Sequence, residues 1–183
     1  MAVATLTEPE LGELHGVCAA NRSYWRRSGE LDPENITVAA VAAMLRDDLA
    51  GAGTELRIAR DEAGRLVGFA EILLAHPVDG DPWIGLLLVD GRLRRHGYGR
   101  AIATALEDRF RDEGAGRAGL AVLENNPEAL AFWTALGYRE TDRRPDRDRG
   151  RPCIVMHKNL RDRPRADRPA AHLTSTGEPA GEG

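Results

Sequence analysis

The sequence predicts an α/β fold in which one mixed sheet is flanked by helices within a single domain. Short segments with the apolar composition of strands alternate along the chain with segments whose apolar residues recur at helical spacing. Turns rich in glycine, proline and aspartate separate these segments. The length of 183 residues, with 42% hydrophobic and 30% charged residues, suits a globular domain with a substantial core and excludes the disordered and fibrous classes.

The first part of the chain is predicted to hold two helices and then two strands. Residues 7–10 have the capping-box pattern Thr-x-x-Glu, so a helix begins there. The polar segment 21–35 is a loop or a broken helix. A second helix begins near Thr37 and stops at the glycines of residues 51–53. Two strands follow around a turn: Leu56–Ala59 and Leu66–Ala75.

The second part is predicted to alternate strands with helices. A loop at residues 76–82 precedes the central strand, whose apolar run ends at Val89. The helix after it carries Ile102, Leu106 and Phe110 on one face. The later elements are a strand at 117–123, a helix at 127–136 that ends at a glycine, and a last strand at 153–157.

An arginine- and glycine-rich turn, residues 90–100, joins the central strand to its helix. The turn holds four arginines against one aspartate. Gly97 and Gly99 let the backbone come close to a ligand. Because the first N–H groups of a helix have no intrahelical partner and the helix dipole is positive there, the turn suits a phosphate or pyrophosphate. A solvated charged loop is the alternative interpretation.

Two blocks of sequence together resemble one family. The spacing Arg94-x-x-Gly97-x-Gly99 resembles the pyrophosphate loop of the GNAT acetyltransferase superfamily, whose ligand is acetyl-CoA. The segment Asn126–Tyr138 is similar to a later helix of that superfamily, where Asn-x-x-Ala is followed by an aromatic residue and then Leu-Gly-Phe or Leu-Gly-Tyr. The resemblance implies a mostly antiparallel mixed sheet flanked by helices.

The resemblance also implies which residues bind acetyl-CoA. The turn would take the pyrophosphate, the main chain of the central strand would lie beside the pantetheine and the acetyl carbonyl, and the later helix would contact the CoA arm. An N-cap role for the asparagine of that helix is compatible with this contact. The implied residues are Leu88, Val89, Arg94, Arg95, His96, Gly97, Tyr98, Gly99, Arg100, Asn126 and Trp133.

The chain departs from the family where proton transfer is expected. The position of the family's strand glutamate falls on Trp83, and that of its helix tyrosine falls on Trp133, whose indole only donates a hydrogen bond. The carboxylates that remain as candidate catalytic groups are Glu71 and Asp81, with His76 as a weaker third. Alternatively, Glu71 faces solvent and Asp81 belongs to a turn.

The predicted function is an acetyl-CoA-dependent N-acetyltransferase that acetylates a primary amine of a small molecule by direct attack in a ternary complex. Glu71, Asp79 and Asp81 favour a cationic amine, and the identity of the acceptor stays open. Two alternatives remain: a non-catalytic acyl-CoA-binding module, which the two tryptophans favour, and an acetyltransferase acting on a protein N-terminus or lysine. A dinucleotide-binding domain is disfavoured because no Gly-x-Gly-x-x-Gly follows a first strand.

The composition of the chain limits which partners and metals are expected. The net charge of −4 argues against a nucleic-acid partner. Two cysteines are too few for a disulfide framework or a usual zinc site, so no metal is expected. No signal peptide or membrane span is visible, which favours the cytoplasm. Residues 1–160 form the predicted GNAT-like acetyltransferase domain, residues 161–183 a mobile C-terminal tail, and a homodimer is left open.

Overall fold

A computed structural model describes residues 6–147 and 149–161 and the backbone of residues 172–175. The helices are α1 (Glu8–Ala19), α2 (Arg22–Ser28), α3 (Val38–Asp48), the 3-10 turn η1 (Gly91–Leu93), α4 (Tyr98–Asp112) and α5 (Pro127–Ala135). The strands are β1 (Thr54–Arg60), β2 (Leu66–Leu73), β3 (Trp83–Val89), β4 (Arg117–Leu123), β5 (Arg139–Pro145), β6 (Pro152–Asn159) and β7 (His172–Ser175). Among the helices of these residues, none is both long and apolar enough to cross a membrane.

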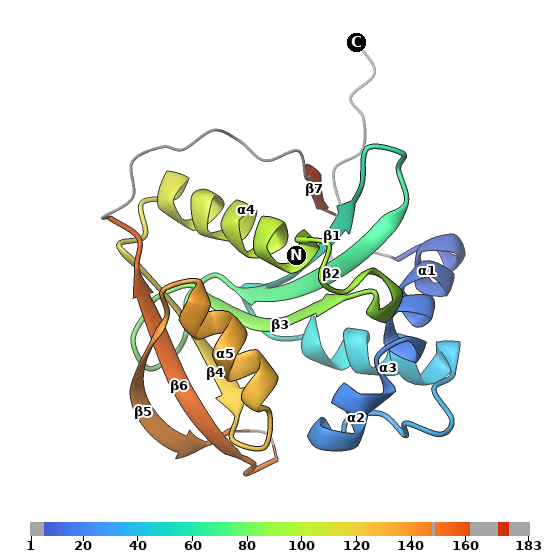
Figure 1. Cartoon of the computed structure of the whole chain (residues 1–183), viewed down its shortest axis with the longest axis horizontal. Coiled ribbons are helices and arrows are strands. Elements are labelled where there is room, and N and C mark those ends of the chain that lie inside the picture. Colours follow the sequence, from blue (N-terminus) through green and yellow to red (C-terminus); the bar gives the residue numbers. More distant parts are fainter. Residues whose placement is uncertain (1–5, 148, 162–171, 176–183) are drawn as a thin grey trace.

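The strands form one sheet in the order β5-β6-β4-β3-β2-β1-β7. The pairing of β3 with β4 is parallel, and the other neighbouring pairs of described strands are antiparallel. Figure 1 shows α4 on one side of the sheet and α1, α2 and α3 gathered on the other. The predicted α/β class, with a mixed and mostly antiparallel sheet, is therefore confirmed.

Each side of the sheet has its own hydrophobic core. One core joins α4 and α5 to the strands through residues such as Ile84, Ile102, Leu106 and Trp133. The other joins α1, α2 and α3 to the opposite face, with Leu14, Trp25, Val41, Ile58 and Phe69 among its members. Burying an apolar stripe of each helix against the sheet supplies the main driving force for this arrangement.

The helix and strand predictions agree with the structure over most of the chain. The segment 21–35 contains the short helix α2, which fits the broken-helix interpretation rather than a plain loop. β5 was not predicted, since its residues are polar; in the structure they are mostly exposed. Within the predicted tail, residues 172–175 form β7, which pairs with β1. The rest of the tail beyond Arg161 lies outside the described residues, so the mobile-tail prediction stays a prediction.

The two central strands separate soon after they meet. β3 and β4 pair only at Trp83 with Gly119 and at Ile84 with Leu120. The next residues of the two strands, Gly85 and Ala121, are both exposed. Exposure is unusual for a strand in the middle of a sheet, so the separation opens the sheet there. We call residues 85–89 and 121–123 the β3–β4 divergence.

Candidate active site

The turn after β3 is held against the end of α1. Asp90 is buried and accepts hydrogen bonds from the main-chain N–H of Arg92 at 3.0 Å and from its guanidinium at 2.6 Å. The Arg92 guanidinium keeps the pKa of Asp90 below its usual value. A Cβ at Gly91 would lie 2.1 Å from the carbonyl oxygen of Ala20. Glycine is therefore required at position 91 for this packing.

The start of α4 is built for an anion. Gly97 is the N-cap of α4 with φ of 84°, and no described side chain caps the helix there. The preceding Arg95 also has a positive φ, of 67°. The N–H groups of the first turn, which no residue of the helix can satisfy, are directed at whatever lies beyond its end. Together with the helix dipole and the neighbouring arginines, they favour a phosphate group.

Asn21, at the end of α1, connects the turn to β3. Its buried side-chain amide donates to the carbonyl oxygens of Val17 at 2.8 Å and Val89 at 2.9 Å. Its amide oxygen accepts a hydrogen bond from Arg94 Nη2 at 2.8 Å. Asn21 thereby fixes both the end of β3 and the direction of Arg94. Asn21 is not predictable from the sequence, because Val89 and Arg94 are remote from it in the chain.

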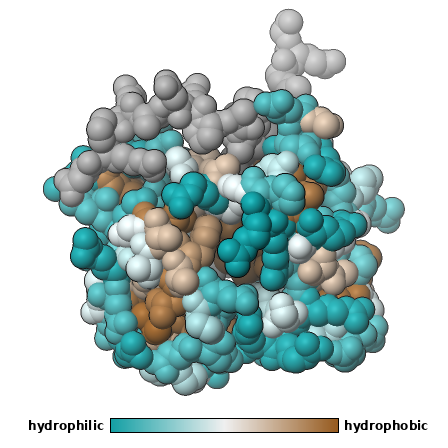
Figure 2. All heavy atoms as spheres, in the orientation of Figure 1, coloured by the Kyte–Doolittle hydropathy of each residue, from teal (hydrophilic) through white to brown (hydrophobic). Residues whose placement is uncertain are grey.

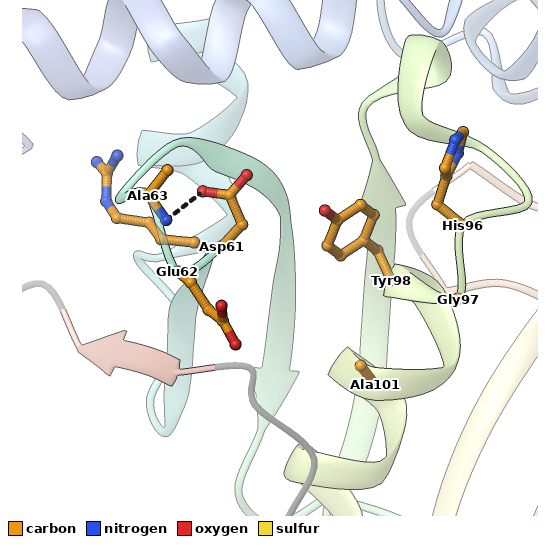
Figure 3. A pocket seen from close by; sticks show the side chains of 8 residues that line it. Asp61, Glu62, Ala63, His96, Gly97, Tyr98 and Ala101 are labelled. Carbon is orange, nitrogen blue, oxygen red and sulfur yellow. Dashed lines mark hydrogen bonds between the residues drawn. The ribbon is translucent and has the colours of Figure 1, made fainter.

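A groove of about 470 Å³ lies beside the turn. His96, Gly97, Tyr98 and Ala101 line one side of it, and Arg60, Asp61, Glu62 and Ala63 of the β1–β2 hairpin line the other. Figure 3 shows Tyr98 pointing from α4 toward the hairpin, with Asp61 opposite and His96 farther out on the turn. Three residues predicted to bind CoA thus border open space.

The two residues predicted to contact CoA at α5, Asn126 and Trp133, both have structural roles. Asn126 caps α5, because its side-chain oxygen accepts from the N–H of Ala129 at 3.2 Å. Trp133 is only 7% exposed and packs edge-on against Phe132 and Tyr138. Figure 2 shows apolar residues gathered over α5 on the face in view. Contacts of either residue with CoA remain predictions.

A polar network surrounds Trp83, at the end of β3 opposite the turn. The indole N–H donates to Asp79 at 3.2 Å, His157 Nε2 lies 3.1 Å from the same carboxylate, and His76 stacks on the indole with ring centroids 3.9 Å apart. Burial lowers the pKa of His76. Trp83 also fits over Gly119, where a Cβ would lie 2.4 Å from the indole nitrogen.

Asp81 lies in the loop before β3, as its turn alternative predicts, and not beside the arginine- and glycine-rich turn. It forms an ion pair with Arg117 at 2.6 Å. It precedes β3, whereas the turn follows that strand, so roughly 20 Å of strand separates them. Asp79, Asp81 and His157 lie close enough to share a metal ion, but Arg117 already neutralises Asp81, and Asp79 accepts hydrogen bonds from Trp83.

Glu71 lies beside the β3–β4 divergence. It pairs across β2 and β3 with Leu86 and is only 7% exposed, so the solvent-facing alternative is wrong. Burial, followed by the negative charges of Asp48 and Glu30, raises its pKa well above the usual value. A carboxyl group with a raised pKa is a competent proton acceptor near neutral pH.

Comparison with known proteins assigns the family. The sequence profile described as the Acetyltransferase (GNAT) family matches residues 21–138. The chain belongs to the GNAT acetyltransferase family. A comparison with curated proteins gives no match.

Solved structures of GNAT proteins share the fold. An acetyltransferase from Thermus thermophilus is 26% identical, with a TM-score of 0.64 over 85% of this chain and 94% of that chain. A spermidine N-acetyltransferase from Vibrio cholerae, in complex with CoA and spermine, is 14% identical, with a TM-score of 0.64 over 85% of this chain and 92% of that chain. A GCN5-related N-acetyltransferase from Kribbella flavida is 23% identical, with a TM-score of 0.59 over 84% and 94% of the two chains.

The GNAT family uses acetyl-CoA, and the residues present fit that molecule. The turn offers arginines and free N–H groups for the pyrophosphate at the start of α4. The divergence leaves one edge of Gly85–Val89 unpaired with β4, so main-chain groups there can bind an extended amide chain. Leu88 and Val89 lie on this unpaired edge and lead into the turn, and Glu71 pairs across β2 and β3 with Leu86 of the same strand, whereas Asp81 precedes the other end of β3.

Proposed function

We propose that this GNAT protein is an acetyl-CoA-dependent N-acetyltransferase that acetylates a primary amine of a small molecule. The β3–β4 divergence carries the proposal. There, main-chain groups of β3 that are unpaired with β4 lead into a turn suited to a pyrophosphate, and a buried carboxyl group, Glu71, pairs with Leu86 of the same strand. Donor and acceptor would therefore meet at this strand in one ternary complex.

On the donor side, the chain would bind and orient acetyl-CoA. Arg94, held by Asn21, and the N–H groups at the start of α4 would bind the pyrophosphate. The main chain at Leu88 and Val89 would hold the pantetheine arm and donate to the acetyl carbonyl oxygen as negative charge develops there. Gly99 faces α5, since a Cβ there would lie 3.4 Å from the Phe132 ring.

On the acceptor side, the amine must lose a proton before it attacks. A free aliphatic amine has a pKa near the roughly 10.4 of lysine and is mostly protonated at neutral pH. We assign its deprotonation to Glu71, directly or through water. The amine nitrogen then bonds to the thioester carbon, the carbon–sulfur bond breaks, and the CoA thiolate takes up the proton that the nitrogen loses as it becomes the amide. Positioning and desolvation supply most of the rate enhancement, so no tyrosine at position 133 is needed.

The second candidate function is a non-catalytic acyl-CoA-binding module. Trp83 and Trp133, at the family's expected glutamate and tyrosine positions, favour it. Trp83 donates a hydrogen bond to Asp79 and packs on Gly119, and Trp133 packs in the core, so neither tryptophan transfers protons. Glu71 favours the enzyme, since a carboxyl buried without function would only destabilise the fold.

A thiol-release assay tests the choice between the two functions. Purified protein is mixed with acetyl-CoA and a panel of primary amines, and released CoA thiol is measured beside a calorimetric titration with CoA. Amine-dependent thiol release supports the enzyme. CoA binding without release for any amine, including a peptide N-terminus and a lysine peptide, would support the binding module. The cytoplasmic location and the lack of a nucleic-acid partner stay part of this proposal.

A further inference from the structure

Three carboxyl groups from separate elements converge beside Glu71. Glu30 comes from the loop after α2, Asp48 from the end of α3 and Glu71 from β2. Burial raises the pKa of the Tyr24 hydroxyl and all three carboxyl groups raise it further, whereas one guanidinium, that of Arg151, lowers it. We call Glu30, Asp48 and Glu71 the carboxyl cluster. Negative charge dominates the surroundings of Tyr24.

Two members of the carboxyl cluster meet directly. The Asp48 carboxyl lies within hydrogen-bonding reach of the Glu71 carboxyl. No N–H or O–H group of the described residues donates to Oε1 of Glu71, although that oxygen is buried. Two carboxyl groups in contact need a proton or a cation between them, because two adjacent carboxylates repel each other strongly in a buried site. The pair is thus a place where positive charge is stabilised.

The other titratable groups near the Asp48–Glu71 pair do not neutralise the negative charge of the carboxyl cluster. On α1, the Cys18 thiol has its pKa raised to about 12 by burial and by Glu71, so it stays neutral. Arg151, before β6, binds Glu30 at 2.8 Å and also contacts Asp146. Its one positive charge is therefore shared between two carboxylates.

The carboxyl cluster is open to solvent on one side. Asp48 is exposed, whereas Glu71 beneath it is buried. Glu71 in turn neighbours Leu86 in the β3–β4 divergence, where the reaction is proposed to occur. Asp48 is therefore the first carboxyl group of this pair that a small molecule arriving from solvent would meet.

We propose that the carboxyl cluster selects an acceptor with a second positive charge, that is, a diamine or polyamine. The inference rests on the proposed N-acetyltransferase function and specifies its substrate class. The reacting nitrogen gives its proton to Glu71 and becomes neutral, so it cannot offset the charge that stays on Asp48 during attack. A second ammonium group on the same molecule can, by ion pairing with Asp48 at the entrance. Asp48 is then a specificity-determining residue.

The test compares two acceptors of equal chain length. We expect kcat/KM with 1,4-diaminobutane to exceed that with n-butylamine by about tenfold or more, mainly through a lower KM. Asp48→Asn should remove most of this preference. Asp47→Asn is the matched control, because it removes the same charge from the neighbouring exposed position of α3 and should keep the preference. Thermal unfolding of both variants checks that they fold.

Glu30→Gln provides a second variant, with an expected partial loss of the preference. Equal kcat/KM for the two amines in the wild type, or an unchanged preference in folded Asp48→Asn, overturns the diamine inference while leaving the N-acetyltransferase proposal intact. Absence of thiol release with every amine tested overturns both. Calorimetry would also overturn the inference if the protein bound Mg²⁺ or Ca²⁺ tightly and did not bind the diamine, because the carboxyl cluster would then be a metal site.

Discussion

The two sides of the β3–β4 divergence are built in different ways. The proposed donor side is a single continuous segment, residues 89–100, which offers main-chain N–H groups and arginines. The proposed acceptor side takes one carboxyl group from each of three segments, at Glu30, Asp48 and Glu71. The first is positive and the second negative. The difference follows from the ligands, since a phosphate can be bound by a backbone conformation, whereas an amine needs side-chain carboxylates in one place.

The two sides should also respond differently to substitutions. The donor side depends on positions where a side chain would strain or block the backbone, such as Gly91 and Gly97. The acceptor side depends on charges that are costly to bury. Changes on the donor side should therefore affect CoA binding, and changes on the acceptor side should affect the rate and its dependence on pH.

The largest expected effect is on the acceptor side. Glu71→Gln should lower kcat/KM by a factor of about 10² to 10⁴, as is typical for loss of general base catalysis. CoA affinity should stay intact, and the acid limb of the wild-type pH profile should disappear, because the group that must lose its proton is gone. Glu8→Gln, an exposed position in the first turn of α1, is the control. A silent Glu71→Gln at every pH would mean that the enzyme captures amine already neutral in solution.

The next effect is on the donor side. Gly97→Glu puts bulk and negative charge at the start of α4, and we expect CoA affinity to fall by about tenfold or more in calorimetry. Gly114→Glu is the matched control, since Gly114 follows the other end of the same helix, has φ of 91° against 84° at Gly97, and likewise has open space around it. Equal CoA affinities in the two variants would sink the pyrophosphate assignment.

A smaller effect of Glu71→Gln concerns stability: the substitution that lowers activity should raise stability relative to wild type as pH rises. Burial raises the pKa of Glu71 above its value in the unfolded chain, so the folded protein favours the protonated form. The stabilisation from this proton is present in full below the unfolded pKa of about 4.3 and is lost as pH rises through the folded pKa. Glu71→Gln cannot ionise and should keep its stability.

Urea unfolding at several pH values measures this difference. The free energy of unfolding of Glu71→Gln, relative to wild type, should increase from acid pH to pH 8. Thus the variant that loses most activity gains stability at alkaline pH. A difference that stays constant across the pH range would show that Glu71 does not titrate with a raised pKa.

The smallest effect is expected at Trp133. Trp133→Phe should keep kcat/KM within about threefold, because an indole does not transfer protons, while the cavity it leaves should cost about 1–3 kcal/mol of stability. Trp133→Tyr should raise kcat by placing a phenol near the leaving sulfur. A hundredfold loss of kcat/KM in Trp133→Phe, with the fold intact, would assign Trp133 a direct part in the reaction.

The accuracy of the sequence predictions follows the range of the interactions. α4 was predictable from the spacing of Ile102, Leu106 and Phe110, and the N-cap role of Asn126 from the following proline. β5 was not, because its polar residues are ordered by pairing with β6 rather than by a buried face of their own. The burial of Glu71 was left open as well, since alternation along β2 does not say which face a helix covers.

The sequence by itself determined the family, the order of the strands and helices apart from α2, β5 and β7, and the position of the proposed donor turn. These depend on residues close together in the chain, where glycine conformations and helix starts impose a local spacing. The tertiary structure alone decided the separation of β3 from β4, the hold of Asn21 on Arg94 and the contact of Asp48 with Glu71. Each of these joins residues from different elements. Their energies arise from burial and charge proximity, which exist only once the helices have packed on the sheet.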